Sequence, residues 1–148
     1  MDVVKIDISE PLRALHQTLI DSRNGYDEAV TVSQDGDLSG LFRQMVILRN
    51  SAISEIEQLL AVDGTAVDQS QSIMSTINRA VIDIRSMLTG LTATTIPAFV
   101  EGEELILQQY DDVIGQLREP ALELVPLLRQ RDVLRDKVES MRSMAAAA

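Results

Sequence analysis

The chain has 148 residues, the length of a single domain, and its 23 acidic and 13 basic residues give a formal charge of −10. It contains no cysteine, which excludes disulfides, thiolate catalysis, zinc–thiolate sites and Fe–S clusters. The negative charge opposes binding to a nucleic-acid backbone. With no tryptophan, two tyrosines and two phenylalanines, the chain also has few rings on which bases could stack.

The sequence contains no targeting signal that predicts a location outside the cytoplasm. The first ten residues lack a basic segment followed by an apolar core, which is the pattern of a secretory signal. No apolar run approaches the roughly 20 residues that cross a bilayer. We therefore expect a cytoplasmic protein that does not bind membranes, and its acidity favours a basic protein partner over anionic lipid.

Apolar residues recur at spacings of three and four along most of the chain, whereas strand-like alternation is nearly absent. This pattern predicts four long helices and one shorter helix between the second and the third. In chain order, the helices are expected at about 9–34, 38–62, 70–89, 96–117 and 120–143.

Local signals set the breaks between these helices. The sequence Asp-Gly-Asp at 35–37 is typical of a turn, and Gly64 is a stop signal after the second long helix. Pro120 suits a first helical turn, while Pro126 lies close enough to that start to bend the helix. The alanine-rich residues 144–148 are expected to fray.

Together these elements predict an all-α, up-down four-helix bundle. Two antiparallel hairpins would be joined by a long crossover that carries the short helix, which is the connectivity of ferritin-like bundles with one long connection. The hairpins are also weakly similar in sequence. Tyr26 and its neighbour Asp27 correspond to Tyr110 and Asp111, and Arg49 corresponds to Arg131.

Several charged residues fall where the core should be. Helical spacing puts Arg49, Arg131 and Glu103 on the inward stripes of their helices and Asp27 at the edge of another. An isolated buried charge costs several kcal/mol, so these groups require partners. We predict a polar layer across the middle of the bundle, built from Tyr26, Asp27, Arg49, Tyr110, Asp111 and Arg131.

Three interpretations of this layer remain open. It is a structural ion-pair network that fixes the register of the helices. Alternatively it is a ligand site, because paired arginines bind carboxylates and phosphates through two hydrogen bonds. In the third interpretation the stripes are misassigned by one residue and the arginines extend to solvent.

Short runs of the sequence resemble a bacterial family of ferritin-like four-helix-bundle proteins of uncharacterised function. These runs are GYDEA at 25–29, IRSMLTG at 84–90, and GEE at 102–104 followed by Tyr110. The resemblance covers about residues 10–143. It implies a ferritin-like fold and carries no activity with it.

A working di-iron centre in a ferritin-like protein needs one Glu on each of two helices and a Glu-x-x-His pair on each of the other two. No Glu-x-x-His occurs here, and Arg49 and Arg131 would repel a cation at the middle of their helices. We therefore expect no cofactor. The alternative is iron or manganese in an atypical carboxylate site, for which the candidates are Glu28, Glu103, Asp112 and His16, with Asp27 and Asp111 as substitutes.

His16 is the only histidine, and at the inward edge of a helix such a residue is most often a hydrogen-bonded packing residue. The leading functional hypothesis is a non-enzymatic accessory interaction protein without a working di-iron site, associated with stress by its resemblance to ferritin-like proteins. It would self-associate, because 45% of its residues are hydrophobic, or bind a protein partner. The alternative hypothesis is a metal-binding or oxidative ferritin-like protein.

Overall fold

Four α-helices and no strand make up the part of the chain that the computed structural model describes, which comprises residues 8–33, 36–62, 95–117 and 121–147. This confirms the predicted all-α class and its four long helices. The helices are α1 (Ser9–Val32), α2 (Gly36–Val62), α3 (Ile96–Gly115) and α4 (Leu124–Ala147).

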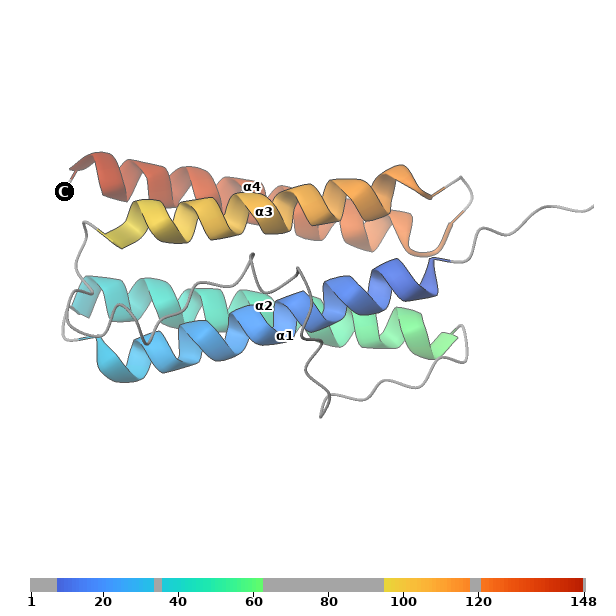
Figure 1. The fold of residues 1–148 in the computed structure, drawn as a ribbon, viewed down its shortest axis with the longest axis horizontal. Helices are drawn as coiled ribbons and strands as arrows, with labels where there is room; N and C mark the ends of the chain where they lie inside the picture. Colours follow the sequence, from blue (N-terminus) through green and yellow to red (C-terminus); the bar gives the residue numbers. More distant parts are fainter. Residues whose placement is uncertain (1–7, 34–35, 63–94, 118–120, 148) are drawn as a thin grey trace, which may run out of the picture.

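The helices pair as two antiparallel hairpins that lie against each other (Figure 1). One hairpin is α1 with α2 and the other is α3 with α4. Because α2 and α3 run in the same direction, the chain leaves α2 at one end of the bundle and enters α3 at the opposite end. The helix predicted at 70–89 lies outside the described residues.

The helix bounds differ from the sequence prediction in ways that have local causes. Gly36 and Asp37 belong to the first turn of α2 rather than to a turn before it, and an acidic side chain is favourable there because it faces the positive end of the helix dipole. In the second hairpin, α3 ends at Gly115. The next two amides then turn back to the carbonyls of Val113 and Ile114.

The last helix is shifted toward the C-terminus. It begins at Leu124 rather than at Pro120, so Pro126 is its third residue, where a missing N–H leaves no intrahelical bond unmade. The helix then continues to Ala147. The prediction of a frayed tail is therefore wrong for 144–147, which the high helical propensity of alanine helps to explain.

Each helix buries one apolar stripe in a shared core. Toward the end of the bundle where α2 and α3 begin, the core contains a cluster of three rings, Tyr26 of α1, Phe42 of α2 and Phe99 of α3, whose centroids are 5.0 to 5.9 Å apart. The α4 stripe consists of Leu127, Leu134, Val138 and Met141, all fully or almost fully buried. None of the helices described here is long and apolar enough to cross a membrane.

Candidate functional site: a buried ion pair at the centre of the bundle

Arg49 and Glu103 form an ion pair across the bundle core. Arg49 lies midway along α2 with 0% of its surface exposed, and Glu103 of α3 is 2% exposed. The Arg49 Nη2 group donates a hydrogen bond to Oε1 of Glu103, and its Nε group donates to Oγ of Ser22 at 3.2 Å. The pair therefore connects α2 of one hairpin to α3 of the other, and Ser22 adds α1.

The second oxygen of Glu103 is also occupied. The hydroxyl of Tyr26 donates to Oε2 of Glu103 at 2.6 Å. Burial raises the pKa of Tyr26 well above its ordinary value, and the neighbouring Glu103 raises it further. Burial alone would lower the pKa of Arg49, but attraction to Glu103 and the two tyrosines outweighs it, so the net shift is upward. The site keeps Arg49 charged and Tyr26 protonated.

A second set of hydrogen bonds runs from the core to the surface. The hydroxyl of Tyr110 donates to Oε1 of Gln130 at 2.8 Å, and Nε2 of Gln130 donates to Oε1 of Glu55 at 2.6 Å. Arg129 pairs with the other oxygen of Glu55. Burial raises the pKa of Tyr110 as well. This chain of contacts joins α3, α4 and α2, so polar contacts in the middle of the bundle involve all four helices.

The predicted polar layer is thus only partly buried. Tyr26, Arg49 and Tyr110 lie in the core, but Asp27 is exposed. Successive helical residues are about 100° apart around the axis, so an inward Tyr26 turns Asp27 outward. Glu103 takes the place that the prediction gave to Asp27 as the acceptor for Arg49.

Arg131 and Asp111 are the other correction to that layer. They pair at 3.1 Å on the surface between α3 and α4, and Arg131 also contacts Asp132 at 3.2 Å. The side chain of Arg131 is 21% exposed, whereas Arg49 is completely buried. The two arginines that correspond in sequence therefore have different surroundings, and they do not converge on one ligand.

The candidate metal ligands do not come together. His16 is buried and its Nε2 lies 3.1 Å from Oε2 of Glu57, as expected for a hydrogen-bonded packing residue. Glu28 is half-buried, Asp112 is exposed, and both oxygens of Glu103 are occupied. Within the described segments, no three His, Cys, Asp or Glu residues are grouped so that they could hold a metal ion.

Sequence reasoning missed Ser22, Gln130 and Glu55. Ser22 and Gln130 carry no charge, so they do not stand out in the sequence as charged residues on an apolar stripe. Among the described residues, two buried side-chain atoms have no hydrogen-bond partner: Nη1 of Arg49 and Oδ2 of Asp21. Burial raises the pKa of Asp21, although Gln17 donates to its other oxygen at 3.0 Å.

These features define a class of protein, an all-α bundle of four helices whose centre is closed by a buried arginine–glutamate pair. The family described as Domain of unknown function (DUF2383) matches residues 7–116, about three quarters of the chain, and the chain belongs to this family. The match spans α1 to α3 and so includes both members of the ion pair. No curated protein and no solved structure matches the chain.

Proposed function

We propose that this protein is a non-enzymatic, ferritin-like bundle of the bacterial cytoplasm that acts through protein contacts, including contacts with further copies of itself. One observation carries the proposal. Both carboxylate oxygens of Glu103, the acidic side chain buried in the described core, are bound by Arg49 and Tyr26. A role in stress responses belongs to the proposal only through the resemblance to ferritin-like proteins.

The arrangement of the helices supports the ferritin-like part. The helices α2 and α3 run in the same direction, and this is the helix order of bundles with one long crossover connection. Metal centres in such bundles are built from inward carboxylates at mid-helix. Here a guanidinium group lies at that place and repels a divalent cation, so the ion pair replaces the metal centre.

Elemental analysis tests the proposal. The protein would be purified without chelators or a metal-affinity step and analysed before and after incubation with Fe(II) or Mn(II) under argon. We expect no bound metal and no change in melting temperature. About two tightly held metal ions per chain, the content of a di-iron centre, would overturn the proposal and favour the metal-binding or oxidative alternative.

The substitution Glu103→Gln distinguishes the metal-free bundle from the metal-binding alternative. In a metal-free bundle, Glu103→Gln removes the charge that balances Arg49, so we expect the protein to lose stability while its metal content stays at zero. In a metal protein the same substitution would lower the metal content of a chain that remains folded. Asp112→Asn is the matched control, because Asp112 is exposed and its substitution should change neither quantity.

A further inference from the structure

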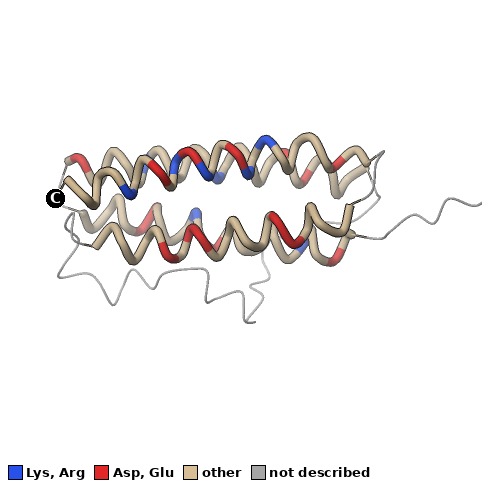
Figure 2. Tube along the Cα trace, turned by 90° about the horizontal axis from the view of Figure 1, so that it is seen from above, with Lys and Arg blue, Asp and Glu red and all other residues tan. Residues whose placement is uncertain are grey.

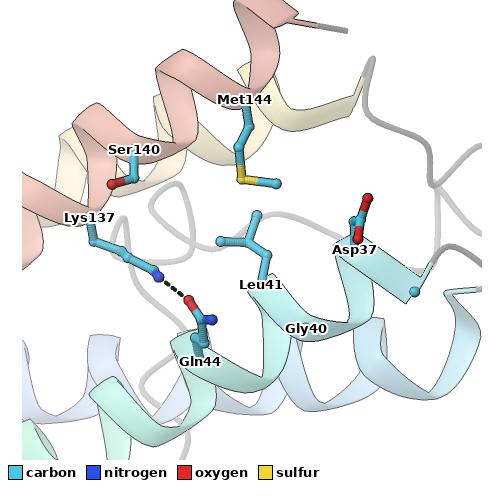
Figure 3. A pocket seen from close by; sticks show the side chains of 8 residues that line it. Asp37, Gly40, Leu41, Gln44, Lys137, Ser140 and Met144 are labelled. Atoms are coloured by element: carbon cyan, nitrogen blue, oxygen red, sulfur yellow. Dashed lines mark hydrogen bonds between the residues drawn. The ribbon is translucent and has the colours of Figure 1, made fainter.

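A cavity lies at one end of the bundle, between the first turns of α2 and the last turns of α4 (Figure 3). Its volume is about 400 Å³, which falls within the roughly 300 to 1,000 Å³ of small-molecule sites in proteins. The side chains that line it divide into a polar group and an apolar group. We consider the two groups in turn, because together they specify the chemistry of a ligand.

The polar group contains a positive charge that no carboxylate of the described residues balances. The helix α4 has five basic residues, and each of its four arginines forms an ion pair with a carboxylate. Its one lysine, Lys137, instead donates a hydrogen bond to Oε1 of Gln44, which is a neutral side chain. The ammonium group at the cavity therefore remains available to an anion.

The hydrogen bond between Lys137 and Gln44 leaves further donors beside each other. The Nζ group of Lys137 carries three N–H donors and uses one, whereas Gln44 uses its oxygen and keeps both N–H donors of Nε2. Ser140 also lines the cavity, but its hydroxyl donates to the backbone oxygen of Asp136 at 3.3 Å. A carboxylate, which has two acceptor oxygens, fits the pair of donors on Lys137 and Gln44.

The apolar group lies beside these donors. Figure 3 shows the side chains of Leu41 on α2 and Met144 on α4 pointing toward each other across the cavity. Two glycines add open space to its α2 side, because a β-carbon at Gly36 or Gly40 would meet nothing within 4 Å. The cavity thus offers apolar contacts and room for a hydrocarbon chain.

We propose that this cavity binds a small molecule with one carboxylate on an apolar chain, the chemistry of a medium-chain fatty acid. The carboxylate accepts hydrogen bonds from Lys137 and Gln44, and the chain lies between Leu41 and Met144. Asp37 lines the cavity about 10 Å from Gln44 along α2, and it repels a carboxylate at that end. The ligand is therefore bound in one orientation. This site goes beyond the proposed function and does not depend on it.

Titration calorimetry of the full chain with octanoate tests the polar part of the site. We expect one octanoate per chain and weaker binding of octylammonium, which has the same chain and the opposite charge. Lys137→Met should weaken octanoate binding by at least about tenfold, because it removes a hydrogen bond from a charged group. Arg135→Met is the matched control, since Arg135 is an exposed cation of α4 that does not line the cavity.

Filling the cavity tests its apolar part. Gly40→Phe puts a ring into the open space and should abolish octanoate binding while the chain keeps a cooperative thermal transition. Ser51→Phe is the matched control, because Ser51 is exposed on α2 and lies outside the cavity lining. Methyl NMR of the methionines gives a second readout. Octanoate should shift the Met144 signal, assigned with Met144→Leu, and leave that of the core residue Met45 in place.

Three outcomes would overturn the proposed site. The first is the absence of octanoate binding at about 1 mM. The second is binding that Lys137→Met and Gly40→Phe both leave unchanged, which would place octanoate elsewhere on the chain. The third is equal affinity for octanoate and octylammonium, because Lys137 would then not select a carboxylate. None of these results bears on metal content or self-association, which are measured independently.

Discussion

At the centre of the bundle, Arg49 and Glu103 depend on each other. Each is almost completely buried, and removal of one partner leaves an uncompensated charge in a medium that solvates charge poorly. Tyr26 and Ser22 satisfy further polar atoms, so the arrangement is a network of four side chains rather than one pair. The stability of the fold should therefore respond to these residues far more than to the surface charges.

Arg49→Met should lower the free energy of unfolding by roughly 3 kcal/mol or more, because it leaves Glu103 buried and unpaired. Adding Glu103→Leu in the same chain should restore most of the loss, since no charge then remains buried. Urea denaturation followed by circular dichroism measures both effects. Arg131→Met is the control at the corresponding surface position and should cost less than about 1 kcal/mol. Equal losses for the two arginines would contradict the buried network.

Asp27 gives a second control for the same network. Asp27→Leu should change the free energy of unfolding by no more than about 0.5 kcal/mol, because the side chain is exposed and Glu103 is the acceptor for Arg49. It should also fail to restore Arg49→Met. Restoration by Asp27→Leu would mean that Asp27, and not Glu103, balances the arginine.

The two tyrosines predict how stability depends on alkaline pH. The pKa values of Tyr26 and Tyr110 are raised in the folded chain, whereas in the unfolded chain both ionise near 10. A raised folded pKa contributes stability that is fully present below the unfolded pKa and is lost as pH rises above it. The free energy of unfolding should thus fall above about pH 10.

The substitution Tyr26→Phe measures how much the hydroxyl of Tyr26 contributes to the free energy of unfolding. It removes a hydrogen bond to a buried carboxylate, so we expect a loss of about 1.5 to 3 kcal/mol at pH 8 and a shallower decline above pH 10. The chain has only these two tyrosines, so tyrosinate absorbance reports on them alone. In the unaltered protein it should rise together with unfolding, and a rise in the folded state would contradict the raised pKa values.

At the scale of the helix, α2 carries a glycine whose replacement should be favourable. Gly40 is inside the helix, and an added β-carbon would meet nothing within 4 Å. Gly40→Ala should raise the free energy of unfolding by about 0.5 to 1 kcal/mol through helix propensity. Thermal unfolding at low concentration measures this gain. A loss of stability would show that the space beside Gly40 is occupied.

Charge distribution distinguishes the helices of the second hairpin. The five charged residues of α3 are all acidic, whereas α4 has five basic and three acidic residues. Figure 2 shows that Lys and Arg lie mainly along one edge of the bundle. Arg142 pairs with Glu104, and Arg131 pairs with Asp111, so the basic helix lies beside the acidic one. These exposed pairs favour the register of α3 on α4 but add little stability.

For the whole molecule, the family match ends at residue 116, yet the fold needs α4. Without α4, the core would lose Leu127, Leu134, Val138 and Met141, and the inner face of α3 would be open to water. A chain that ends at residue 117 should therefore fail to unfold cooperatively and should bind a hydrophobic dye. Calorimetry and dye fluorescence measure this. A cooperative transition close to that of the full chain would show that α1 to α3 are sufficient.

The sequence by itself determined the all-α class, the four long helices and most of their inward faces, because a 3.6-residue period is a local property of the chain. It also identified Arg49 and Glu103 as charges on apolar stripes. It also placed Arg131 on an inward stripe, and it placed Asp27 and Asp111 in the same layer as neighbours of inward tyrosines. All three lie nearer the surface, because a helical period assigns inward positions only to within about one residue.

Only the tertiary structure decided which charges pair. Arg49 reaches Glu103 on another hairpin, and residues so far apart in the sequence are brought together by how the hairpins pack, which no local pattern encodes. The same packing left Arg131 at the surface beside Asp111, although its sequence surroundings resemble those of Arg49. It also set the cavity at the start of α2, because the residues that line it come from both α2 and α4.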